Sequence, residues 1–330
     1  MIPVAIVTGF LGAGKTTLLR RVLRDPLFAD SAVIVNEFGA VALDHDLIVA
    51  SEDMLVSVST GCLCCVMRSD LTATLLDLRR RRAAKQVPRF ARVLVETSGL
   101  ADPAPILHAL MADAAVAATH RLEAVVALVD AVHGAAALDR HPEAARQAML
   151  ADRILLTKAD LVADPAPLLA RLRALNPAAP IRAATQGAVP PEWLFGAGRH
   201  AADPAALLAW LDAMGHAARH TPGVAAVAIE REAPIPALAL TLWMQGLAEH
   251  AGGRLLRLKG LVRIAEAPAR PMAIHAVQHL VHPPEWLEAW PPGEARSRIV
   301  LIGKDLPPRF PARLLAAIEA EVVAEAARRG

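Results

Sequence analysis

Eight residues near the N-terminus have the spacing of a phosphate-binding loop. Residues 9–16 read GFLGAGKT and match G-x-x-x-x-G-K-[ST]. Glycines let the backbone bend so that N–H groups point at phosphate oxygens, and a following helix adds its positive dipole end. This pattern would place Lys15 on the β and γ phosphates and Thr16 on Mg²⁺. A glycine-rich turn without a ligand is the alternative. The expected nucleotide contacts are Gly9, Gly12, Ala13, Gly14, Lys15, Thr16 and Thr17.

A second chemical signal is the carboxylate that ends the apolar run 92–96, RVLVE. This run should form a strand beside the strand that leads into the phosphate loop. Glu96 would then hold Mg²⁺ directly or through water, and the N–H of Gly99 would contact the γ-phosphate. An exposed glutamate at a strand end is the alternative. We expect the catalytic residues to be Lys15, Thr16 and Glu96.

The segment Thr157-Lys158-Ala159-Asp160 has the character of a base-reading motif. It follows the run 153–157, which we expect to be the last strand of the sheet. The Asp160 carboxylate can accept two hydrogen bonds from the N–H edge of guanine, a pattern that adenine does not offer. Lys158 can lie along the base plane, and Thr157 stands where the common GTPase motif has asparagine. An ordinary turn after a strand is the alternative.

The three cysteines, Cys62, Cys64 and Cys65, fall within four residues. Disulfide frameworks spread their cysteines along a chain, so reduced thiols are expected. Thiolates are soft ligands for Zn²⁺, Co²⁺, Cu⁺ or iron, and a tight turn can aim several at one ion. Water or a side chain after the run 32–36 would supply a fourth ligand. A redox pair and inert core cysteines are the alternatives. The side-chain candidates for the fourth ligand are Glu37, Asp44 and His45.

Length and charge set the class of protein. The chain has 330 residues and a formal net charge of +2, with no basic footprint for nucleic acid or an anionic membrane surface. Charged residues interrupt the longest apolar stretches, so no transmembrane span is expected. The N-terminal region lacks the basic segment of a signal peptide. We therefore expect a cytoplasmic protein with a small-molecule or protein partner.

The apolar runs predict an α/β fold. Strands that are apolar throughout and alternate with helices indicate a parallel sheet with helices on both faces. We expect helices at 16–27, 69–85 and 103–115. The expected strands are residues 2–8, 32–36, 55–59, 92–96, 124–129 and 153–157.

A change in sequence composition after residue 195 predicts a second domain. A helix at 204–214 and a loose segment at 216–223 would separate a first domain, 1–215, from a second, 223–330. The second reads strand, helix, three strands and helix, which indicates a small α+β domain with a partly antiparallel sheet. Its elements would be 224–230, 235–250, 254–264, 271–279, 298–302 and 311–328. The arginine run 79–82 is typical of a solvated helix face.

Taken together, the motifs resemble those of CobW-like proteins in the CobW/HypB/UreG GTPase group. GFLGAGKTT, VNEFG, GCLCC, ETSGLADP and LTKAD occur in the family's order, and RLLRLKGLVRI, AVQHLVHPP and RIVLIGKDL resemble the C-terminal CobW domain. The resemblance implies a P-loop GTPase domain, a smaller C-terminal domain, slow GTP hydrolysis and metal delivery to a client. By match, it assigns the metal thiolates to Cys62, Cys64 and Cys65 and the guanine contact to residues 157–160.

Two departures from the family pattern bear on metal binding. Ala40 stands where family members often have a further glutamate, which weakens a second carboxylate site near Glu37. The histidine-rich stretch that many members carry is reduced here to His200, His216 and His220, so bulk metal storage is not expected. The second domain contains His275, His279 and His282. These histidines could form a metal site or a client contact, but histidines in such a strand are more often hydrogen-bonded structural residues.

The leading hypothesis is a GTP-hydrolysing metallochaperone that holds Zn²⁺ or Co²⁺ through C-x-C-C, with GTP and Mg²⁺ controlling its loops. The cysteine segment falls between the Glu37 loop and the Glu96 strand end, so we expect metal and nucleotide to bias one another. The alternative is a regulatory switch that assembles a metalloenzyme or cobalamin-pathway complex without carrying metal. An ATP-dependent kinase is disfavoured by Asp160. The expected partner is a client metalloprotein or cobalamin-pathway complex, and a homodimer is left open.

Overall fold

The computed structural model describes most of the chain, and every structural statement below concerns the described residues. These are residues 1–35, 55–57, 66–176, 179–184, 189–195, 224–251, 254–277, 280–281, 284–290, 293 and 295–329. They fall into two compact units, Met1–Gly198 and Arg199–Gly330. The predicted domain boundary at 215–223 and the predicted helix 204–214 lie outside the described residues.

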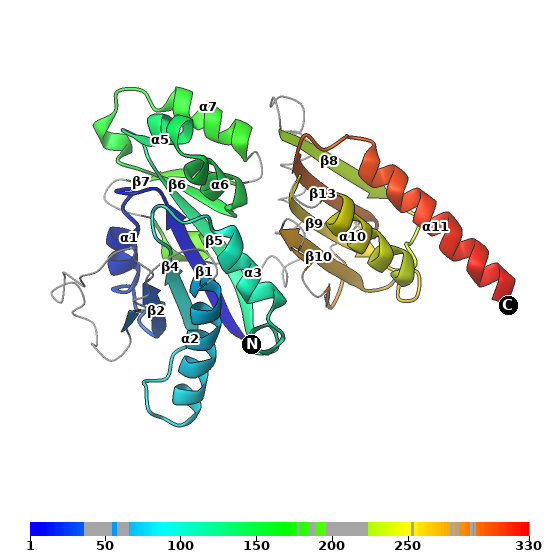
Figure 1. The fold of residues 1–330 in the computed structure, drawn as a ribbon, viewed down its shortest axis with the longest axis horizontal. Helices are drawn as coiled ribbons and strands as arrows, with labels where there is room; N and C mark the ends of the chain where they lie inside the picture. The colour runs from blue at the N-terminus through cyan, green and yellow to red at the C-terminus, as the bar shows by residue number, and fades with distance from the viewer. Residues whose placement is uncertain are drawn as a thin grey trace. The chain divides into compact units, whose positions relative to one another are not determined.

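The first unit is built on a parallel sheet with the strand order β3-β2-β4-β1-β5-β6-β7 (Figure 1). The strands run parallel in every described pair, as the sequence predicted. Because β7 lies beyond β6, the expectation that β6 would be the last strand was wrong. The strands are β1 (Ile2–Gly9), β2 (Ser31–Val35), β3 (Leu55–Ser57), β4 (Arg92–Glu96), β5 (His120–Asp130), β6 (Arg153–Thr157) and β7 (Ile181–Ala184).

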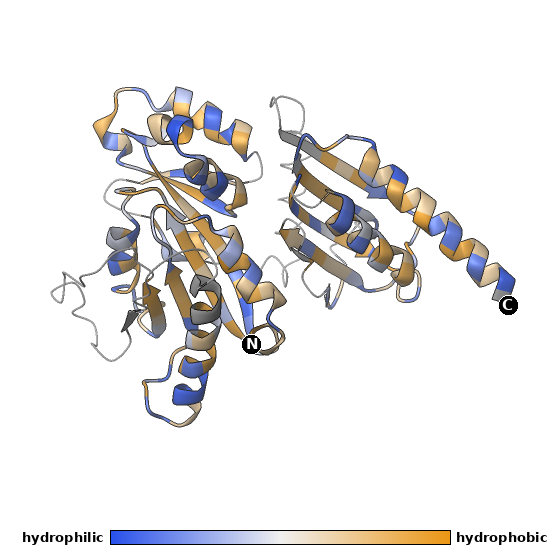
Figure 2. Ribbon diagram, in the orientation of Figure 1, coloured by the Kyte–Doolittle hydropathy of each residue, from blue (hydrophilic) through white to orange (hydrophobic). Residues whose placement is uncertain are grey.

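Helices cover both faces of this sheet, as predicted. The side chains of α1 and α8 share one core with β1, β4 and β5, and those of α5, α6 and α7 share another with β5 and β6. Figure 2 shows that the central strands are the most apolar part of the unit. The helices are α1 (Lys15–Val22), α2 (Val66–Ala83), α3 (Ala104–Ala112), α4 (Ala114–Ala117), α5 (Gly134–Arg140), α6 (Pro142–Leu150), α7 (Ala166–Leu175) and α8 (Pro191–Phe195), with a 3₁₀ turn η3 (Ala159–Leu161).

Two predicted helices end earlier than expected. α1 stops at Val22 rather than at Leu27, because Pro26 has no N–H and its ring would clash with the preceding turn. The chain turns there instead, and the N–H of Leu27 donates to Asp25 Oδ1 at 3.0 Å. The predicted helix 103–115 divides at Asp113, whose carboxylate accepts the first N–H groups of α4 at 2.9 and 3.0 Å.

The order of the edge strands corrects one expectation about the loops. β3, which precedes the cysteines, is the edge strand, and β2 lies between it and β4. The segment that contains Glu37 follows β2, so it begins between β3 and β4. The sequence analysis had expected the cysteine segment, which follows β3, in that place.

In its described residues, the second unit has a six-stranded antiparallel sheet and two helices. Its strand order is β11-β10-β9-β13-β8, and β12 pairs with β10. Trp243 of α10 is fully buried against the sheet, and its Nε1 donates to the carbonyl of Pro311 at 2.9 Å. The elements are β8 (Val224–Arg231), α10 (Ala237–Ala251), β9 (Leu255–Arg263), β10 (Pro271–Val277), β11 (Leu280–Val281), β12 (Glu285–Trp286), β13 (Ser297–Lys304) and α11 (Phe310–Arg329).

The predicted α+β character of this unit is confirmed. The sheet is antiparallel in all its described pairs, where the sequence predicted only a partly antiparallel one. The two-residue strands β11 and β12 were not predicted, because segments this short carry no periodic signal. None of the helices in the described part of either unit is long and apolar enough to cross a membrane.

His120 begins β5 and is an ionisable group inside the first unit. Its side chain is 2% exposed, and its Nδ1 lies 2.9 Å from the hydroxyl of Thr119. Burial lowers the pKa of His120 to about 4, and the positive charge of Arg79 lowers it further. An unfolded histidine has a pKa near 6.5, so the folded state binds fewer protons between these values. Acidification through this range should therefore destabilise the fold.

We expect the free energy of unfolding to fall by about 2 kcal/mol between pH 7 and pH 5 through this group alone. Urea denaturation of the wild-type chain and of His120→Gln at both pH values measures the effect. The variant should lose about 2 kcal/mol less than wild type over the same interval. Equal losses in the two proteins would show that His120 is not the group responsible.

Candidate nucleotide site

The predicted phosphate loop joins the end of β1 to the start of α1. Gly9 has φ +144° and Gly14 has φ +93°, backbone conformations that other residues rarely adopt. A Cβ at Gly9 would also lie 2.4 Å from the carbonyl oxygen of Leu128 in β5. The chain can therefore pass β5 and turn into the loop only with glycine at this position.

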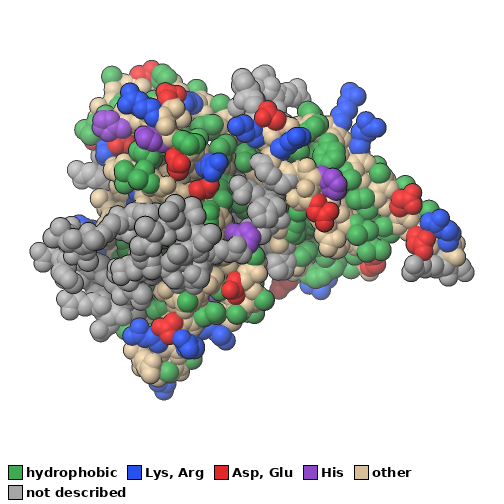
Figure 3. Space-filling view, in the orientation of Figure 1, with side chains coloured by type: hydrophobic (Ala, Val, Ile, Leu, Met, Phe, Trp, Pro, Cys, Tyr) green, Lys and Arg blue, Asp and Glu red, His purple; other side chains and the backbone are tan. Residues whose placement is uncertain are grey.

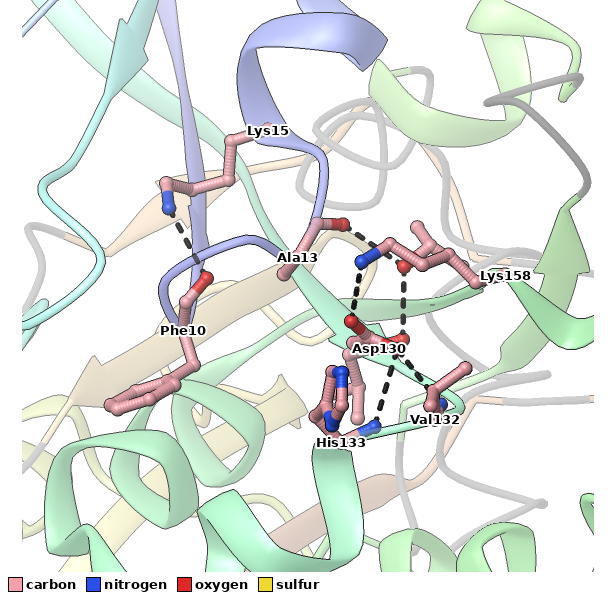
Figure 4. Close-up of polar contacts among 9 residues, drawn as sticks. Phe10, Ala13, Lys15, Asp130, Val132, His133 and Lys158 are labelled. Carbon is pink, nitrogen blue, oxygen red and sulfur yellow. Dashed lines mark hydrogen bonds and ion pairs between the residues drawn. The ribbon is translucent and has the colours of Figure 1, made fainter. Parts of the chain in front are cut away.

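Lys15 lies over the loop that precedes it. Its side chain is 8% exposed, and its Nζ donates to the carbonyl of Gly9 at 2.9 Å and lies 3.4 Å from that of Phe10 (Figure 4). The aliphatic stem is packed and the charged head is held at the loop. This position suits an ammonium that would contact phosphate oxygens above the loop.

Thr16 and Glu96 are brought together from α1 and β4. Thr16 Oγ1 donates to Glu96 Oε1 at 2.7 Å, and Glu96 is 3% exposed. The pairing of Val7 with Glu96 places β4 directly beside β1, as the sequence predicted. A hydroxyl and a carboxylate are the hard oxygen ligands that Mg²⁺ prefers, so this pair fits the predicted magnesium site.

The segment after β4 packs closely on the phosphate loop. A Cβ at Gly99 would lie 2.7 Å from the backbone nitrogen of Leu11. Below this contact, the buried hydroxyl of Thr97 donates to that of Thr8 at 2.9 Å, which ties β4 to β1. A movement of Gly99 would therefore be transmitted directly to the loop.

Gln147 of α6 holds this same segment from the other side. Its side chain is 1% exposed, and its Nε2 donates to the carbonyls of Gly99 at 3.2 Å and Ala101 at 3.0 Å. Arg146, the residue before Gln147 in α6, forms an ion pair with Asp102 at 2.6 Å. The sequence analysis did not single out Gln147, because no motif links it to residues 99–101 and the contact exists only in the fold.

Thr157 takes a structural role at the other flank of the loop. Its Oγ1 donates to the carbonyl of Ala13 at 2.9 Å and lies 3.3 Å from that of Val129. Although asparagine is usual at this position of the motif, the threonine hydroxyl still reaches the phosphate loop. The base-reading segment and the phosphate loop are therefore joined directly.

Lys158 forms an ion pair that the sequence analysis missed. Its Nζ lies 2.6 Å from Oδ2 of Asp130, which ends β5 and is 6% exposed (Figure 4). Asp130 Oδ1 also accepts the backbone N–H groups of Val132 at 2.8 Å and His133 at 3.3 Å. Burial alone would raise the pKa of Asp130, but the hydrogen bonds from Lys158 and the backbone lower it overall. Asp130 thus fixes the head of Lys158, a contact compatible with the predicted placement of its stem along a base.

Asp160 and Thr17 are exposed side chains among the predicted nucleotide contacts. Asp160 lies in η3, two residues after Lys158, whose φ of +55° turns the chain at the end of β6. Thr17 lies in the first turn of α1 and is exposed. Both side chains are therefore accessible to a ligand from solvent.

The predicted transition-metal site cannot be compared with the structure. Its residues, Cys62, Cys64, Cys65, Glu37, Asp44 and His45, all lie outside the described residues, as do His279 and His282. His275 is on β10, opposite Lys259 of β9. Within the described part of the chain, no group of three or more His, Cys, Asp and Glu side chains could hold a metal ion.

Comparison with known proteins gives matches over both units. Residues 3–183 match the CobW/HypB/UreG nucleotide-binding domain, and residues 224–320 match the cobalamin synthesis protein cobW C-terminal domain. The zinc chaperone YjiA of Escherichia coli (strain K12) is 32% identical over 306 residues, 93% of this chain and 95% of that protein. The zinc-regulated GTPase metalloprotein activator 1 of Schizosaccharomyces pombe is 33% identical over 172 residues, 50% of this chain and 41% of that protein.

Solved structures agree with this assignment. The crystal structure of Zn(II)-bound YjiA GTPase from E. coli matches with a TM-score of 0.70 and 28% identity, covering 96% of this chain and 98% of that one. The nucleotide-binding domain match alone spans more than half of the chain. The chain therefore belongs to the CobW/HypB/UreG family, with a P-loop GTPase fold followed by a smaller C-terminal domain.

Proposed function

We propose that the protein is a GTP-hydrolysing metallochaperone that binds a transition-metal ion through Cys62, Cys64 and Cys65 and delivers it to a client protein or cofactor pathway. The observation that carries the GTPase part is the convergence of Lys15, Thr16 and Glu96 at one loop. The metal part is supported by the C-x-C-C segment and by relatives named as zinc chaperones. Zinc is thus favoured over cobalt as the cargo.

In the proposed reaction, water attacks the γ-phosphorus and the bond to the β–γ bridging oxygen breaks, which gives GDP and phosphate. Lys15 would stabilise the negative charge on the β and γ phosphates, and the loop N–H groups would orient them. Thr16 and Glu96 would hold Mg²⁺, which when bound neutralises charge on the same oxygens. Gly99 would contact the γ-phosphate, so its position would differ between GTP and GDP states.

Selection of guanine is proposed to depend on Asp160, with Lys158 and Thr157 in support. The Asp130 ion pair positions Lys158, and the Thr157 hydrogen bond ties the segment to the phosphate loop. The carboxylate of Asp160 is exposed and can accept both N–H groups of the guanine edge. A wrong base would leave these groups unpaired, which makes such selection strong.

Replacing Asp160 with asparagine should shift the preference from GTP toward xanthosine triphosphate, because xanthine offers a carbonyl acceptor where guanine has its amino donor. We expect the ratio of kcat/KM for the two nucleotides to change by at least about tenfold. Steady-state phosphate release measures it, and Lys15→Ala serves as the control that hydrolyses neither. An unchanged ratio would argue against Asp160 as the base reader.

Gln147→Leu should lower kcat for GTP by about tenfold while affinity for GDP changes by less than about twofold. The leucine cannot donate to the carbonyls of Gly99 and Ala101, so the segment that would contact the γ-phosphate loses its position. Arg146→Ala is the matched control on the same helix, since it removes only a partly exposed ion pair to that segment. Equal losses in the two variants, or a parallel loss of GDP affinity, would contradict the assignment.

The strand register supports communication between the proposed metal and nucleotide sites. Val35 of β2 pairs with Ser57 of β3 on one side and with Glu96 of β4 on the other. Neighbouring strands lie about 4.8 Å apart, so the chain leaves β3 roughly 10 Å from Glu96. Glu37 follows Val35 by two residues, and the cysteines follow Ser57. The segment with Glu37 therefore begins beside the strand that ends in Glu96, and the cysteine segment begins one strand further away.

If GTP changes the affinity for metal, metal must change the affinity for GTP by the same factor, typically about 5 to 150-fold. Replacing Cys64 and Cys65 together with serine should remove high-affinity Zn²⁺ and Co²⁺ binding and abolish the metal dependence of GTP affinity, while GTP itself still binds. Titration of both ions into reduced protein, with and without a GTP analogue, measures the coupling.

The same titration separates this function from its rival. A regulatory switch that carries no metal would bind neither ion tightly in any nucleotide state. Equal metal affinities with and without the analogue would leave a GTPase whose cysteines do not take part in nucleotide-controlled delivery.

A further inference from the structure

A cleft of about 750 Å³ opens at the amino-terminal edge of the parallel sheet, where β1, β4 and β5 begin. The phosphate loop leaves the opposite, carboxyl-terminal end of β1. The cleft is therefore separate from the nucleotide site. Four cationic side chains line it, Arg79, Arg82, Lys85 and Arg89, and no carboxylate is among its described lining residues. We call this feature the basic cleft.

The arginine run at the end of α2 divides between this cleft and solvent. Arg79 and Arg82, three residues apart on one helix face, line the cleft, whereas Arg80 pairs with Asp77 at 2.8 Å outside it. The guanidinium of Arg82 lies 5.1 Å from the centre of the Phe90 ring, and this cation–π contact holds the side chain in place. Figure 3 shows Lys and Arg side chains gathered where α2 ends, at the lower end of the first unit in this view. Arg79, Arg80 and Arg81 are exposed and Arg82 is half-buried, so the run is a solvated helix face as predicted, and Arg79 and Arg82 lie on the side of that face that lines the cleft.

Stabilisation of the helix does not account for the whole cluster. Cations in the last turn of a helix complement its dipole, which explains Arg82, whereas Arg79 lies before that turn. The effect is confined to that turn, and Lys85 and Arg89 come after the helix has ended at Ala83. Their convergence on the same cleft concentrates positive charge beyond what α2 requires. Burial is the main cause of the lowered pKa of His120, and the positive charges of Arg79 and of the N-terminal amine lower it further.

The form and lining of the cleft favour one class of ligand. Met1 and Val87 supply apolar surface among the cations, and no aromatic side chain is among the described lining residues. Single-stranded nucleic acid is usually held by aromatic stacking along a basic groove, and the net charge of this chain is only +2. Arginine guanidinium groups match carboxylates in bidentate geometry. A surface of this kind suits a peptide with acidic and apolar side chains.

We propose that the basic cleft binds an acidic segment of a partner protein, in which carboxylates alternate with apolar side chains. The carboxylates contact Arg79, Lys85 and Arg89, and the apolar side chains pack on Met1 and Val87. This site goes beyond the metallochaperone function and does not depend on it.

The test uses the full chain and a fluorescein-labelled peptide of alternating Glu and Leu, with fluorescence anisotropy as the readout. Wild-type protein should bind the peptide, less tightly at high salt, and should not bind a matched Lys–Leu peptide. Arg79→Ala combined with Arg89→Ala should weaken binding by at least about tenfold. Arg80→Ala combined with Arg81→Ala removes the same charge from outside the cleft and should change affinity by less than about twofold. GTP hydrolysis should stay at the wild-type rate in both, which shows that they are folded.

Three results would overturn the proposal. One is no detectable binding of the acidic peptide by the wild-type chain. Another is an equal loss of affinity in the two double variants, which would indicate attraction to net charge alone. The third is displacement of the labelled peptide by double-stranded DNA or inorganic triphosphate at a lower concentration, counted in negative charges, than that of the peptide. The cleft would then prefer phosphate to carboxylate.

Discussion

In the sheet of the first unit, Val7 is paired with Glu96 of β4, Gly9 with Leu128 of β5, and Asp130 of β5 with Thr157 of β6. This parallel register decides where each group of the nucleotide site can lie. Parallel strands end at the same edge, so four segments that are distant in sequence emerge side by side. The phosphate loop can enter this row only because Gly9 leaves no Cβ to meet the carbonyl of Leu128.

Buried polar contacts then hold the loop in place from both flanks. On one side, Gly99 packs against Leu11 and Thr16 donates to Glu96. On the other, Thr157 donates to the carbonyl of Ala13. Buried polar groups are costly when unpaired, so each contact fixes the orientation of its partner as well as its position. A triphosphate would thus meet a loop whose geometry is set before binding, which lowers the cost of organising the site.

The sequence predicted the parts of this arrangement that are local. Apolar runs indicated β1 to β6, and the glycine spacing indicated the phosphate loop between a strand and a helix. Asp130 and Gln147 were not predicted, because their partners lie in other elements and become neighbours only after the sheet forms. α1 was predicted too long because its apolar pattern continued past Pro26, where backbone geometry outweighs periodicity. β7 was missed because four residues give too short a pattern to recognise.

Helix α6 holds one flank of the nucleotide site in place through contacts at both of its ends. At its N-terminus the ring of His141 stacks on Phe10 of the phosphate loop, with 4.5 Å between ring centres, and Gln147 holds the segment after β4. At its C-terminal end, buried Asn176 donates to three carbonyls, those of Ala148, Met149 and Ala151, at 2.8, 3.1 and 2.9 Å. Moving this helix would break several buried hydrogen bonds at once, and each would leave a group unpaired.

The flank formed by β5, β6 and α6 therefore resists displacement. Glu37 and the cysteines follow β2 and β3, the strands of the opposite flank. The buried contacts of α6 thus hold the phosphate loop from the side away from the proposed metal ligands.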